Sequence, residues 1–327
     1  MLHALIVRLK LAFVFVFVLI QACLVQTSWA ANEPAWPTKQ VTLVVPYPPG
    51  AITDTVGRRL GNQLSAALNV PVVIENKPGA GANLGAAFVS NSQPNGATIL
   101  FTSYGNIMID SVTEAQHKLS PVAAVGPMTV VMLVRPDLPY KTIEELVAYA
   151  RANPQKISFA SVGIGSSYHL LIEQMNTLGK LDMVHIPYKG GAASMADFLG
   201  GRVDVMLATW LFARPYVNDN RARAVALTNG ERSPTLPNLP TVNERAVPGV
   251  KLIDGLGVFA PKGLPEALVA RLNKEINQII QEPAMKAWLT NEAIPPTAMT
   301  TAAFEKMLVD EAKPLDKLIR ENKIGMK

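Results

Sequence analysis

The sequence predicts an α/β protein with two lobes, each built on a parallel or mixed sheet with helices on both faces, and with a ligand cleft between the lobes. Three observations indicate this fold class. Short runs rich in β-branched residues alternate with amphipathic helical stretches over most of the chain. A long apolar segment, residues 121–136, interrupts the alternation, and a second alternating set follows it. Strands joined through helices need crossover connections and therefore lie parallel.

Lobe one begins with three predicted strands, at residues 41–47, 70–75 and 98–103. Apolar residues at helical spacing over 56–68 predict a helix after the first strand, and residues 83–90 predict a shorter one after the second. Strand, helix, strand, helix and strand in this order indicate right-handed crossovers in one parallel sheet.

The segment 121–136 is expected to pass from lobe one into lobe two. There, Thr142 and Glu145 form a capping box that opens a helix. The further strands and helices expected in lobe two lie at 157–161, 167–178, 184–188, 193–199, 203–208 and 222–228.

A second crossing is expected near residues 249–258, after which the chain returns to lobe one. Pro265 stands at the first turn of a predicted helix, and a last helix is expected from about residue 302. The predicted division of the chain is a signal peptide at 1–30, lobe one at 36–130 and 250–327, and lobe two at 131–249.

The first thirty residues have the three-part pattern of a secretory signal peptide. Arg8 and Lys10 precede an apolar run that is short for a membrane span, and Ser28 and Ala30 are the small residues of a cleavage site after Ala30. We therefore expect an exported, periplasmic protein. An uncleaved anchor and a lipoprotein modified at Cys23 are the alternatives, although Ile20-Gln21-Ala22 is a poor lipobox.

Composition excludes several classes of protein. Loss of Arg8 and Lys10 lowers a net charge that is only +5 in the full chain, and no block of five basic residues occurs, so we expect no nucleic-acid partner. Cys23 is the only cysteine, so the mature chain has no disulfide and depends on its core for stability. We expect a soluble monomer.

Catalytic and cofactor motifs are missing. The chain has no H-E-x-x-H, C-x-x-C, Walker A or G-x-S-x-G pattern, so no metal, no cofactor and no enzymatic activity are expected. Residues 79–85 resemble a dinucleotide loop weakly, and we interpret them as a structural turn. A hydrolase using Ser166, Ser167 and His169 is a less favoured alternative, because no oxyanion motif accompanies them.

Two loops have the pattern of anion sites. Residues 46–54 and 160–167 each follow a strand, contain glycine, and lead into a helix whose first amides lack intrahelical acceptors. Such loops bind anions through backbone N–H groups without basic side chains. We expect the amides of the Gly50 and Gly165 turns to face a shared crevice, free of internal acceptors. The alternative is that both are ordinary turns before capped helices.

Five segments resemble the Bug or TctC-like family, the substrate-binding proteins of tripartite tricarboxylate transporters. They are WPTKQVTLVVPYPPGAITD (36–54), PVVIENKPGAGANLGAAFV (71–89), ISFASVGIGSSYHL (157–170), MVHIPYKGGAASMADFLGGRVDVM (183–206) and RSPTLPNLPTVNE (232–244). The resemblance implies a type II-like periplasmic-binding-protein fold that closes on a small organic carboxylate, without a cofactor. It implies a large and a small membrane transporter subunit as partners. A ligand sensor that signals to a membrane kinase is the alternative function.

The resemblance also suggests where the ligand lies. It assigns the ligand carboxylate to the loop 49–54, and it makes 161–167 the partner loop from lobe two. Lys189 is either a cationic ligand contact or an exposed rim residue. The candidate ligand-binding residues are Tyr47, Pro49, Gly50, Ala51, Ile52, Thr53, Asp54, Tyr104, Ser161, Gly163, Gly165, Ser166, Ser167, His169, Lys189 and Trp210.

The chain departs from the family pattern at three places. Ala51 and Ile52 follow Gly50 where the family has further glycines, and Trp210 lies where the family has polar residues. Residues 116–120 replace a longer stretch of the family. We therefore expect a ligand with a hydrophobic or aromatic body, enclosed by Tyr47, Ile52, Tyr104 and Trp210. The alternative is that Tyr104 and Trp210 are core or rim residues.

Overall fold

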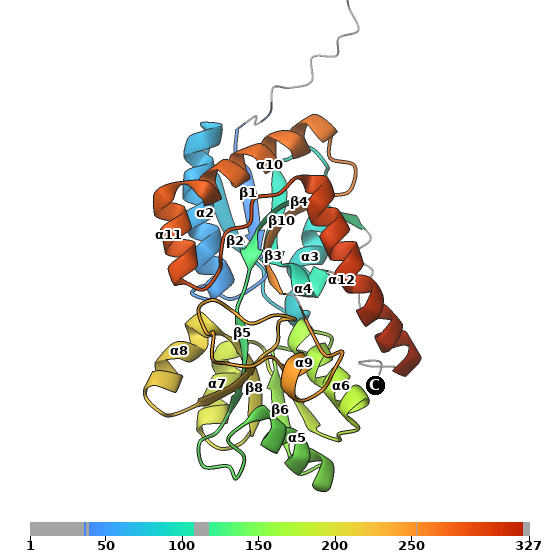
Figure 1. The fold of residues 1–327 in the computed structure, drawn as a ribbon. Coiled ribbons are helices and arrows are strands. Elements are labelled where there is room, and N and C mark those ends of the chain that lie inside the picture. The colour runs from blue at the N-terminus through green and yellow to red at the C-terminus, as the bar shows by residue number, and fades with distance from the viewer. Residues whose placement is uncertain (1–35, 37–38, 108–117, 253, 323–327) are drawn as a thin grey trace, which may run out of the picture. The chain divides into compact units, whose positions relative to one another are not determined.

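Two five-stranded sheets form the framework of the protein (Figure 1). The computed structural model describes residues 36, 39–107, 118–252 and 254–322, so the predicted signal peptide and Cys23 lie outside the described residues. Residues 39–327 cluster by their contacts into one unit, separate from residues 1–38.

Lobe one contains the first sheet. Its strands are β1 (Val41–Val45), β2 (Val72–Asn76), β3 (Thr98–Ser103), β4 (Leu119–Pro127) and β10 (Gly255–Pro261). Their order is β2-β1-β3-β10-β4. β1 runs parallel to β2 and β3, as the predicted crossovers require, whereas β10 runs antiparallel to both β3 and β4.

Lobe two contains the second sheet, which repeats this pattern. Its strands are β5 (Val130–Val134), β6 (Ser158–Ser161), β7 (Val184–Pro187), β8 (Val205–Thr209) and β9 (Arg223–Leu227). Their order is β7-β6-β8-β5-β9. β6 runs parallel to β7 and β8, and β5 runs antiparallel to β8 and β9. The prediction of a two-lobed α/β fold with mixed sheets is confirmed.

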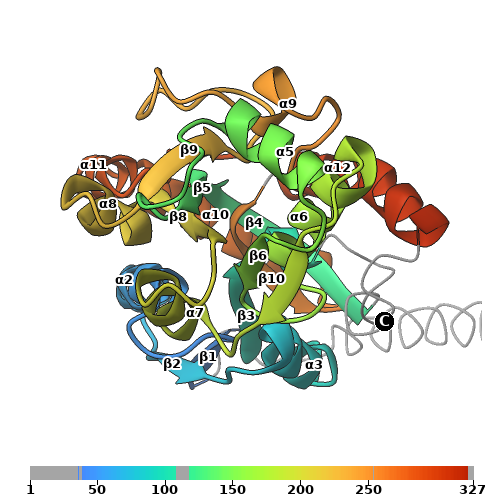
Figure 2. The same cartoon turned by 90° about the horizontal axis from the view of Figure 1, so that it is seen from below.

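Helices cover both faces of each sheet, as Figure 2 shows for lobe two, where α5 and α6 lie on one side and α7 and α8 on the other. The helices of lobe one are α2 (Ile52–Leu68), the 3-10 turn η2 (Ala80–Ala82), α3 (Asn83–Ser90), α4 (Tyr104–Ile107), α10 (Glu266–Gln281), α11 (Pro283–Asn291) and α12 (Thr301–Asn322). Those of lobe two are α5 (Ile143–Ala152), α6 (Ser167–Gly179), α7 (Gly191–Leu199), α8 (Trp210–Asn218) and α9 (Val242–Arg245). Four of these, α4, α8, α9 and α11, were not expected from the sequence.

The chain passes between the sheets twice. The first passage joins β4 to β5, and the second leads from β9 back to β10. The two passages lie side by side, because the amide of Met128 in the first donates to the carbonyl of Asp254 in the second at 2.9 Å. Asp254 therefore sits where the chain crosses from one lobe to the other.

Each lobe has its own hydrophobic core. Val44, Leu100 and Phe259 are fully buried in lobe one, and Leu133, Phe198 and Leu227 are fully buried in lobe two. Full burial of such side chains stabilises a fold by about 1.5–3 kcal/mol each. The strands that end at the candidate site are therefore firmly anchored.

Candidate functional site

The loop between β1 and α2 carries the first group of predicted ligand residues. Gly50 has a φ of +82°, a backbone conformation that favours glycine. Ala51 is the N-cap of α2 and offers no side-chain acceptor. Among the described residues, the first-turn amides of Ile52, Thr53 and Asp54 have no hydrogen-bond acceptor. Helix α2 therefore begins with free donors at the positive end of its dipole.

Asp54 fixes the shape of this loop and is only 2% exposed. Its carboxylate accepts hydrogen bonds from the Gly50 amide at 2.8 Å, from Asn76 Nδ2 at 2.8 Å and from Arg58 Nε at 3.0 Å. Burial alone raises the pKa of Asp54, but the bonds from Arg58, Gly50 and Asn76 outweigh burial and lower the pKa below its ordinary value. The expectation that the Gly50 amide is free for a ligand is wrong, because Asp54 already accepts from it.

The loop between β6 and α6 carries the second group. Ser166 is the N-cap of α6, and its hydroxyl accepts from the amide of His169. The amide of Gly165 donates to His169 Nδ1 at 3.1 Å, and the amide of Gly163 donates to Ser161 Oγ at 3.1 Å. The expectation of a free Gly165 amide is also wrong. The amides of Gly163, Gly165 and His169 thus donate within this segment, as the alternative of an ordinary turn before a capped helix predicts.

Two histidines stack behind this second loop. The rings of His169 and His185 lie 3.9 Å apart at 20°, and Ser161 Oγ lies 2.6 Å from His185 Nε2. Burial lowers the pKa of His169 to about 4, and burial together with the His169 ring lowers the pKa of His185 to about 4. Both rings are therefore neutral at pH 7. Because Ser166 donates to the carbonyl of Gly163 at 2.7 Å, it is not paired with the His169 ring as a hydrolase would need.

Asn106 links the two loops across the lobes. Its Nδ2 donates to Tyr47 Oη at 2.8 Å, and its Oδ1 accepts from the amide of Ser167 at 2.9 Å. Burial and the charge of Asp254 raise the pKa of Tyr47 to about 12. Tyr47 and Ser167, both predicted from the sequence, are thus brought together through a residue that sequence reasoning missed.

Asp254 is a second residue that sequence reasoning missed, and it is 2% exposed. Its Oδ1 accepts from Ser103 Oγ at 2.6 Å, from the Gly255 amide at 2.7 Å and from the Gly105 amide at 3.1 Å. Its Oδ2 lies 3.5 Å from Ser167 Oγ in lobe two. Burial raises the pKa of Asp254. The sequence feature that could have identified Asp254 is a single acidic residue within the mainly apolar crossing near residues 249–258.

A third loop also reaches the lobe-two loop. Ala80, Gly81 and Ala82 all have positive φ values, of 48°, 62° and 81°. The amide nitrogen of Gly81 lies 3.5 Å from the place that a Cβ on Gly163 would occupy. Left-handed backbone at alanine costs energy and tends to occur at functional sites. The turn that we had interpreted as structural therefore lies against the candidate site.

The remaining predicted residues lie in different surroundings. Tyr104 is 2% exposed and packs edge-on against Phe304 with ring centroids 5.8 Å apart, so it is a core residue of lobe one. Trp210 opens α8 and packs, partly buried, against the lobe-two core. Lys189 is exposed between β7 and α7, and Pro49 is exposed in the first loop.

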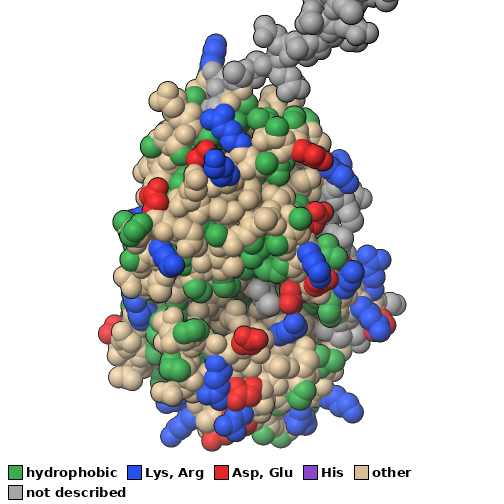
Figure 3. Space-filling view, turned by 45° about the horizontal axis from the view of Figure 1, so that its top comes forward, with side chains coloured by type: hydrophobic (Ala, Val, Ile, Leu, Met, Phe, Trp, Pro, Cys, Tyr) green, Lys and Arg blue, Asp and Glu red, His purple; other side chains and the backbone are tan. Residues whose placement is uncertain are grey.

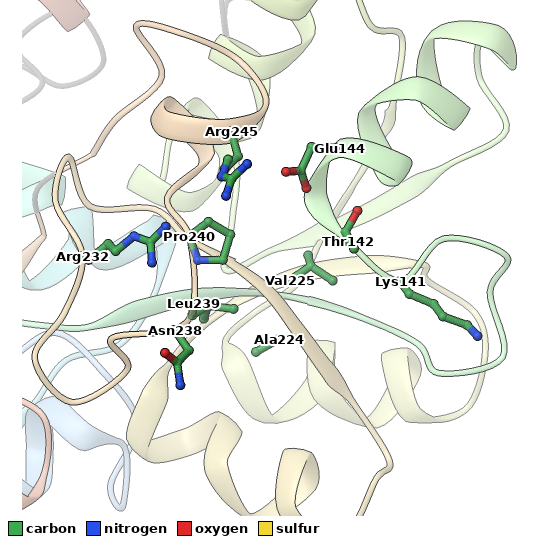
Figure 4. Close-up of a pocket in the computed structure, with 10 residues that line it drawn as sticks. All are labelled: Lys141, Thr142, Glu144, Ala224, Val225, Arg232, Asn238, Leu239, Pro240 and Arg245. Carbon is green, nitrogen blue, oxygen red and sulfur yellow. The ribbon is translucent and has the colours of Figure 1, made fainter.

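A surface cavity of ≈ 410 Å³ lies elsewhere in lobe two, and none of the predicted ligand residues line it. It is lined by Lys141, Thr142, Glu144, Ala224, Val225, Arg232, Asn238, Leu239, Pro240 and Arg245. Figure 4 shows Arg245 and Glu144 directed toward each other and Lys141 directed outward. Arg232 is already paired with Glu244 through contacts of 2.9 and 2.6 Å, so this cavity has little free positive charge.

Three further features bear on nucleic-acid, membrane and metal sites. On the face seen in Figure 3, Lys and Arg are interspersed with Asp and Glu rather than gathered in a basic patch. Within the described ranges, no helix is both long and apolar enough for a membrane span. The same residues contain no group of three or more His, Cys, Asp or Glu side chains placed to hold a metal ion.

Comparison with known proteins assigns the family. The profile of TctC, described as the tripartite tricarboxylate transporter family receptor, matches residues 56–324. The UPF0065 protein in the tcbD-tcbE intergenic region of Pseudomonas sp. (strain P51) is 32% identical over 298 residues, which cover 89% of this chain and 88% of that protein.

Two solved structures share the fold closely. R. palustris Rpa4515 with adipate is 27% identical, with a TM-score of 0.79, over 87% of this chain and 97% of that one. MatC (Rpa3494) from Rhodopseudomonas palustris with bound malate is 27% identical, with a TM-score of 0.78, over 87% of this chain and 100% of that one. The chain therefore belongs to the TctC family of tripartite tricarboxylate transporter receptors, and it is a solute-binding receptor rather than an enzyme.

Proposed function

We propose that this receptor captures a small organic carboxylate in the periplasm and presents it to the membrane subunits of a tripartite transporter. The observation that carries the proposal is the uncapped start of α2, where the amides of Ile52, Thr53 and Asp54 have no acceptor among the described residues. The adipate and malate bound by the two similar structures are carboxylates, which supports the same ligand class.

The available donors set the strength of this site. Each hydrogen bond to a charged group contributes about 1.5–3 kcal/mol, so two or three amides give about 3–9 kcal/mol. Micromolar binding requires about 8 kcal/mol, before the costs of ordering the ligand are met. The amides therefore orient a carboxylate but need help from the ligand body. Tyr47 and Ile52, both partly buried, remain the proposed apolar walls.

Transport adds requirements beyond ligand binding. The predicted lobe boundaries, 36–130 with 250–327 and 131–249, make the two adjacent crossings the proposed hinge. Ligand capture would close the lobes there, and the large and small transporter subunits would recognise the closed form. Export follows from the predicted signal peptide with cleavage after Ala30, and the relatives described as periplasmic support that location.

Proline at position 52 tests the amide site directly. Proline is favoured at the first helical position, and Ala51, with φ −65° and ψ 159°, already has the extended conformation that a following proline requires. Ile52→Pro therefore removes one donor without disrupting α2. We expect the dissociation constant for a bound carboxylate to rise about 10- to 100-fold, the value of one charge-assisted bond.

Ile52→Ala is the matched control, because it removes the side chain and keeps the N–H group. Calorimetric titration of both variants with ligands identified by thermal shift separates the two contributions. Ligand at 100 times its dissociation constant stabilises a protein by about 2.7 kcal/mol, which such a screen detects easily. Equal affinities for the two variants would show that the α2 amides do not hold the carboxylate.

A further inference from the structure

We propose that Asn106 is a latch between the lobes, a side chain of lobe one whose hydrogen bond to the start of α6 stabilises the arrangement in which the two lobes are in contact. The proposal goes beyond carboxylate capture, because the bond joins two groups of the protein itself. It contributes to the lobe contact whether or not a ligand is bound. It also makes Asn106 a positioning residue for Tyr47 and Ser167, which come from different lobes.

The side-chain amide of Asn106 has one orientation that satisfies both of its neighbours. The backbone N–H group of Ser167 can only donate, so the oxygen of Asn106 must face it, and Oδ1 accepts this bond at 2.9 Å. Nδ2 is then directed at Tyr47 Oη, an oxygen that can accept, at 2.8 Å. The bond within lobe one thus fixes the orientation of the oxygen that binds lobe two.

Both ends of the bond between the lobes are buried, since Asn106 is 8% exposed and Ser167 is 2% exposed. When the lobes are in contact, loss of the acceptor leaves a buried N–H group unpaired, whereas separation of the lobes lets water bind both groups. Removal of one partner of a buried hydrogen bond costs more free energy than the intact bond contributes. The equilibrium between lobes in contact and lobes apart therefore depends on Asn106.

The segment that carries Asn106 is held to lobe one and to the second crossing. Asn106 lies in α4, directly after β3, and the amide of Gly105 before it donates to Asp254 Oδ1 at 3.1 Å. Ser103 Oγ donates to the same oxygen at 2.6 Å. Ser167, by contrast, begins α6 in lobe two. A rotation of the lobes at the crossings therefore changes the distance between Asn106 Oδ1 and the Ser167 amide, and a hydrogen bond tolerates a change of only a few tenths of an ångström.

A second contact joins the same loop of lobe two to lobe one. A Cβ on Gly81, in the left-handed turn of η2, would lie 3.7 Å from the carbonyl oxygen of Ile164. A Cβ on Gly163 would lie 3.5 Å from the amide nitrogen of Gly81. These are packing distances without a directional bond, so they limit how closely the loop approaches and do not hold it there. The loop 161–167 should therefore respond to the loss of the Asn106 bond.

Asn106→Ala removes the latch, and Asn176→Ala is the matched control. Asn176 Oδ1 also accepts from a backbone amide, that of Met183 at 3.1 Å, but both residues belong to lobe two. On the protein without added ligand at pH 7, hydrogen–deuterium exchange of the loop 161–167 should be at least about tenfold faster in Asn106→Ala than in the wild type, while β1 and β8 stay unchanged. Small-angle X-ray scattering should give this variant a larger radius of gyration. Asn176→Ala should change exchange only near Met183 and leave the radius unchanged.

Proline at position 167 tests the bond from its other end. Ser167 is the first residue of α6, and Ser166 before it, with ψ 154°, has the extended conformation that a following proline requires. Ser167→Pro removes the N–H group that Asn106 binds, whereas Ser167→Ala keeps it. We expect faster exchange of the loop and a larger radius in the proline variant than in the alanine variant. This pair provides the test should Asn106→Ala not fold.

Three results would overturn the latch. Equal loop exchange and equal radii in the wild type and Asn106→Ala would show that Asn106 does not hold the lobes in contact. Faster loop exchange with an unchanged radius would show that the lobes stay together without the bond. Faster exchange throughout Asn106→Ala would indicate a general loss of stability instead. Because no carboxylate takes part in these measurements, the latch and the proposed function can fail independently of each other.

Discussion

The two strand-to-helix loops of this receptor begin their helices with nearly the same backbone but use their donors differently. Ala51 before α2 has φ −65° and ψ 159°, and Ser166 before α6 has φ −66° and ψ 154°. The hydroxyl of Ser166 caps α6, whereas the methyl group of Ala51 cannot accept a hydrogen bond. The first turn of α2 therefore presents three amides without an acceptor among the described residues, whereas Ser166 Oγ and Asn106 Oδ1 occupy two first-turn amides of α6.

The surroundings of the two glycine turns reinforce this contrast. Among the described residues other than Gly50 and its two chain neighbours, no atom lies within 4 Å of the place that a Cβ on Gly50 would occupy, whereas backbone atoms of Gly81 approach the corresponding place at Gly163. The first loop is open beside its free amides, and the second is packed against lobe one. A glycine-containing loop before a helix is therefore available to an anion only where neither a capping side chain nor a neighbouring segment occupies its amides.

The largest expected effect is a dependence of stability on pH. It arises at His169, behind the second loop. The pKa of His169 is about 4 in the folded protein and about 6.5 in an unfolded chain. At pH values between these two pKa values, the imidazole is protonated in the unfolded state but not in the folded state. The free energy of unfolding therefore falls as the pH falls from about 6.5 to about 4. The loss attributable to His169, which is 7% exposed at its side chain, is on the order of 3 kcal/mol.

Urea unfolding at pH 7 and pH 4.5 measures this effect. His169→Asn is the appropriate comparison, because its oxygen can still accept from the Gly165 amide while it carries no proton in this range. The variant should lose less stability on acidification than the wild type. The same loss in both proteins would mean that the stacked histidines do not control the acid sensitivity of the second lobe.

The next effect in size is the loss of the cap on α6. Ser166→Ala leaves the amide of His169 without its acceptor and should lower the free energy of unfolding by about 1 kcal/mol. The contrast between the loops predicts that this variant keeps its affinity for a carboxylate ligand, because the ligand is held at α2. Chemical denaturation gives the first quantity and calorimetric titration the second. A large loss of affinity would assign the ligand to the second loop.

The smallest effect, and the sharpest test of the comparison, is the addition of a cap to α2. Ala51→Ser gives the first loop the cap that the second already has, on a backbone that fits it. We expect a gain of about 0.5–1 kcal/mol in stability, together with carboxylate binding that is weakened up to about tenfold, because the new hydroxyl competes for a ligand donor. Ala51→Gly, which adds no acceptor, is the control. Unchanged affinity with increased stability would show that the capped amide is not the one that the ligand uses.

Much of the framework was predictable from local patterns. The strands ending at Ser103 and Ser161, the helix starting at Ile143 after the Thr142 cap, and the helix at Asn83–Ser90 all follow from alternation, capping and turn residues. The missed helix α8 begins at Trp210 directly after a strand and contains Pro215, so neither a cap nor a breaker indicated its position. Helix α9 has only four residues, too few to show a period.

The candidate site was predictable only in part, because the free or occupied state of a donor depends on partners far away in the chain. Asn106 reaches Ser167 across 61 positions, and Asp254 reaches Ser103 across 151. Nothing in the sequence near Gly165 indicates that His169 Nδ1 accepts a hydrogen bond from the Gly165 amide. Tyr104 is adjacent to a strand end, as a wall residue would be, yet it packs into the core beside Phe304.

By itself the sequence determined the two-lobed α/β architecture, the family, and the two loops at which a ligand was to be sought, because periodicity, capping residues and motifs act over a few neighbouring positions. The tertiary structure alone decided which loop keeps its amides free. A backbone donor is satisfied by whichever acceptor the fold brings within hydrogen-bond distance, and at the start of α6 these acceptors are Ser166 Oγ from the same loop and Asn106 Oδ1 from the other lobe.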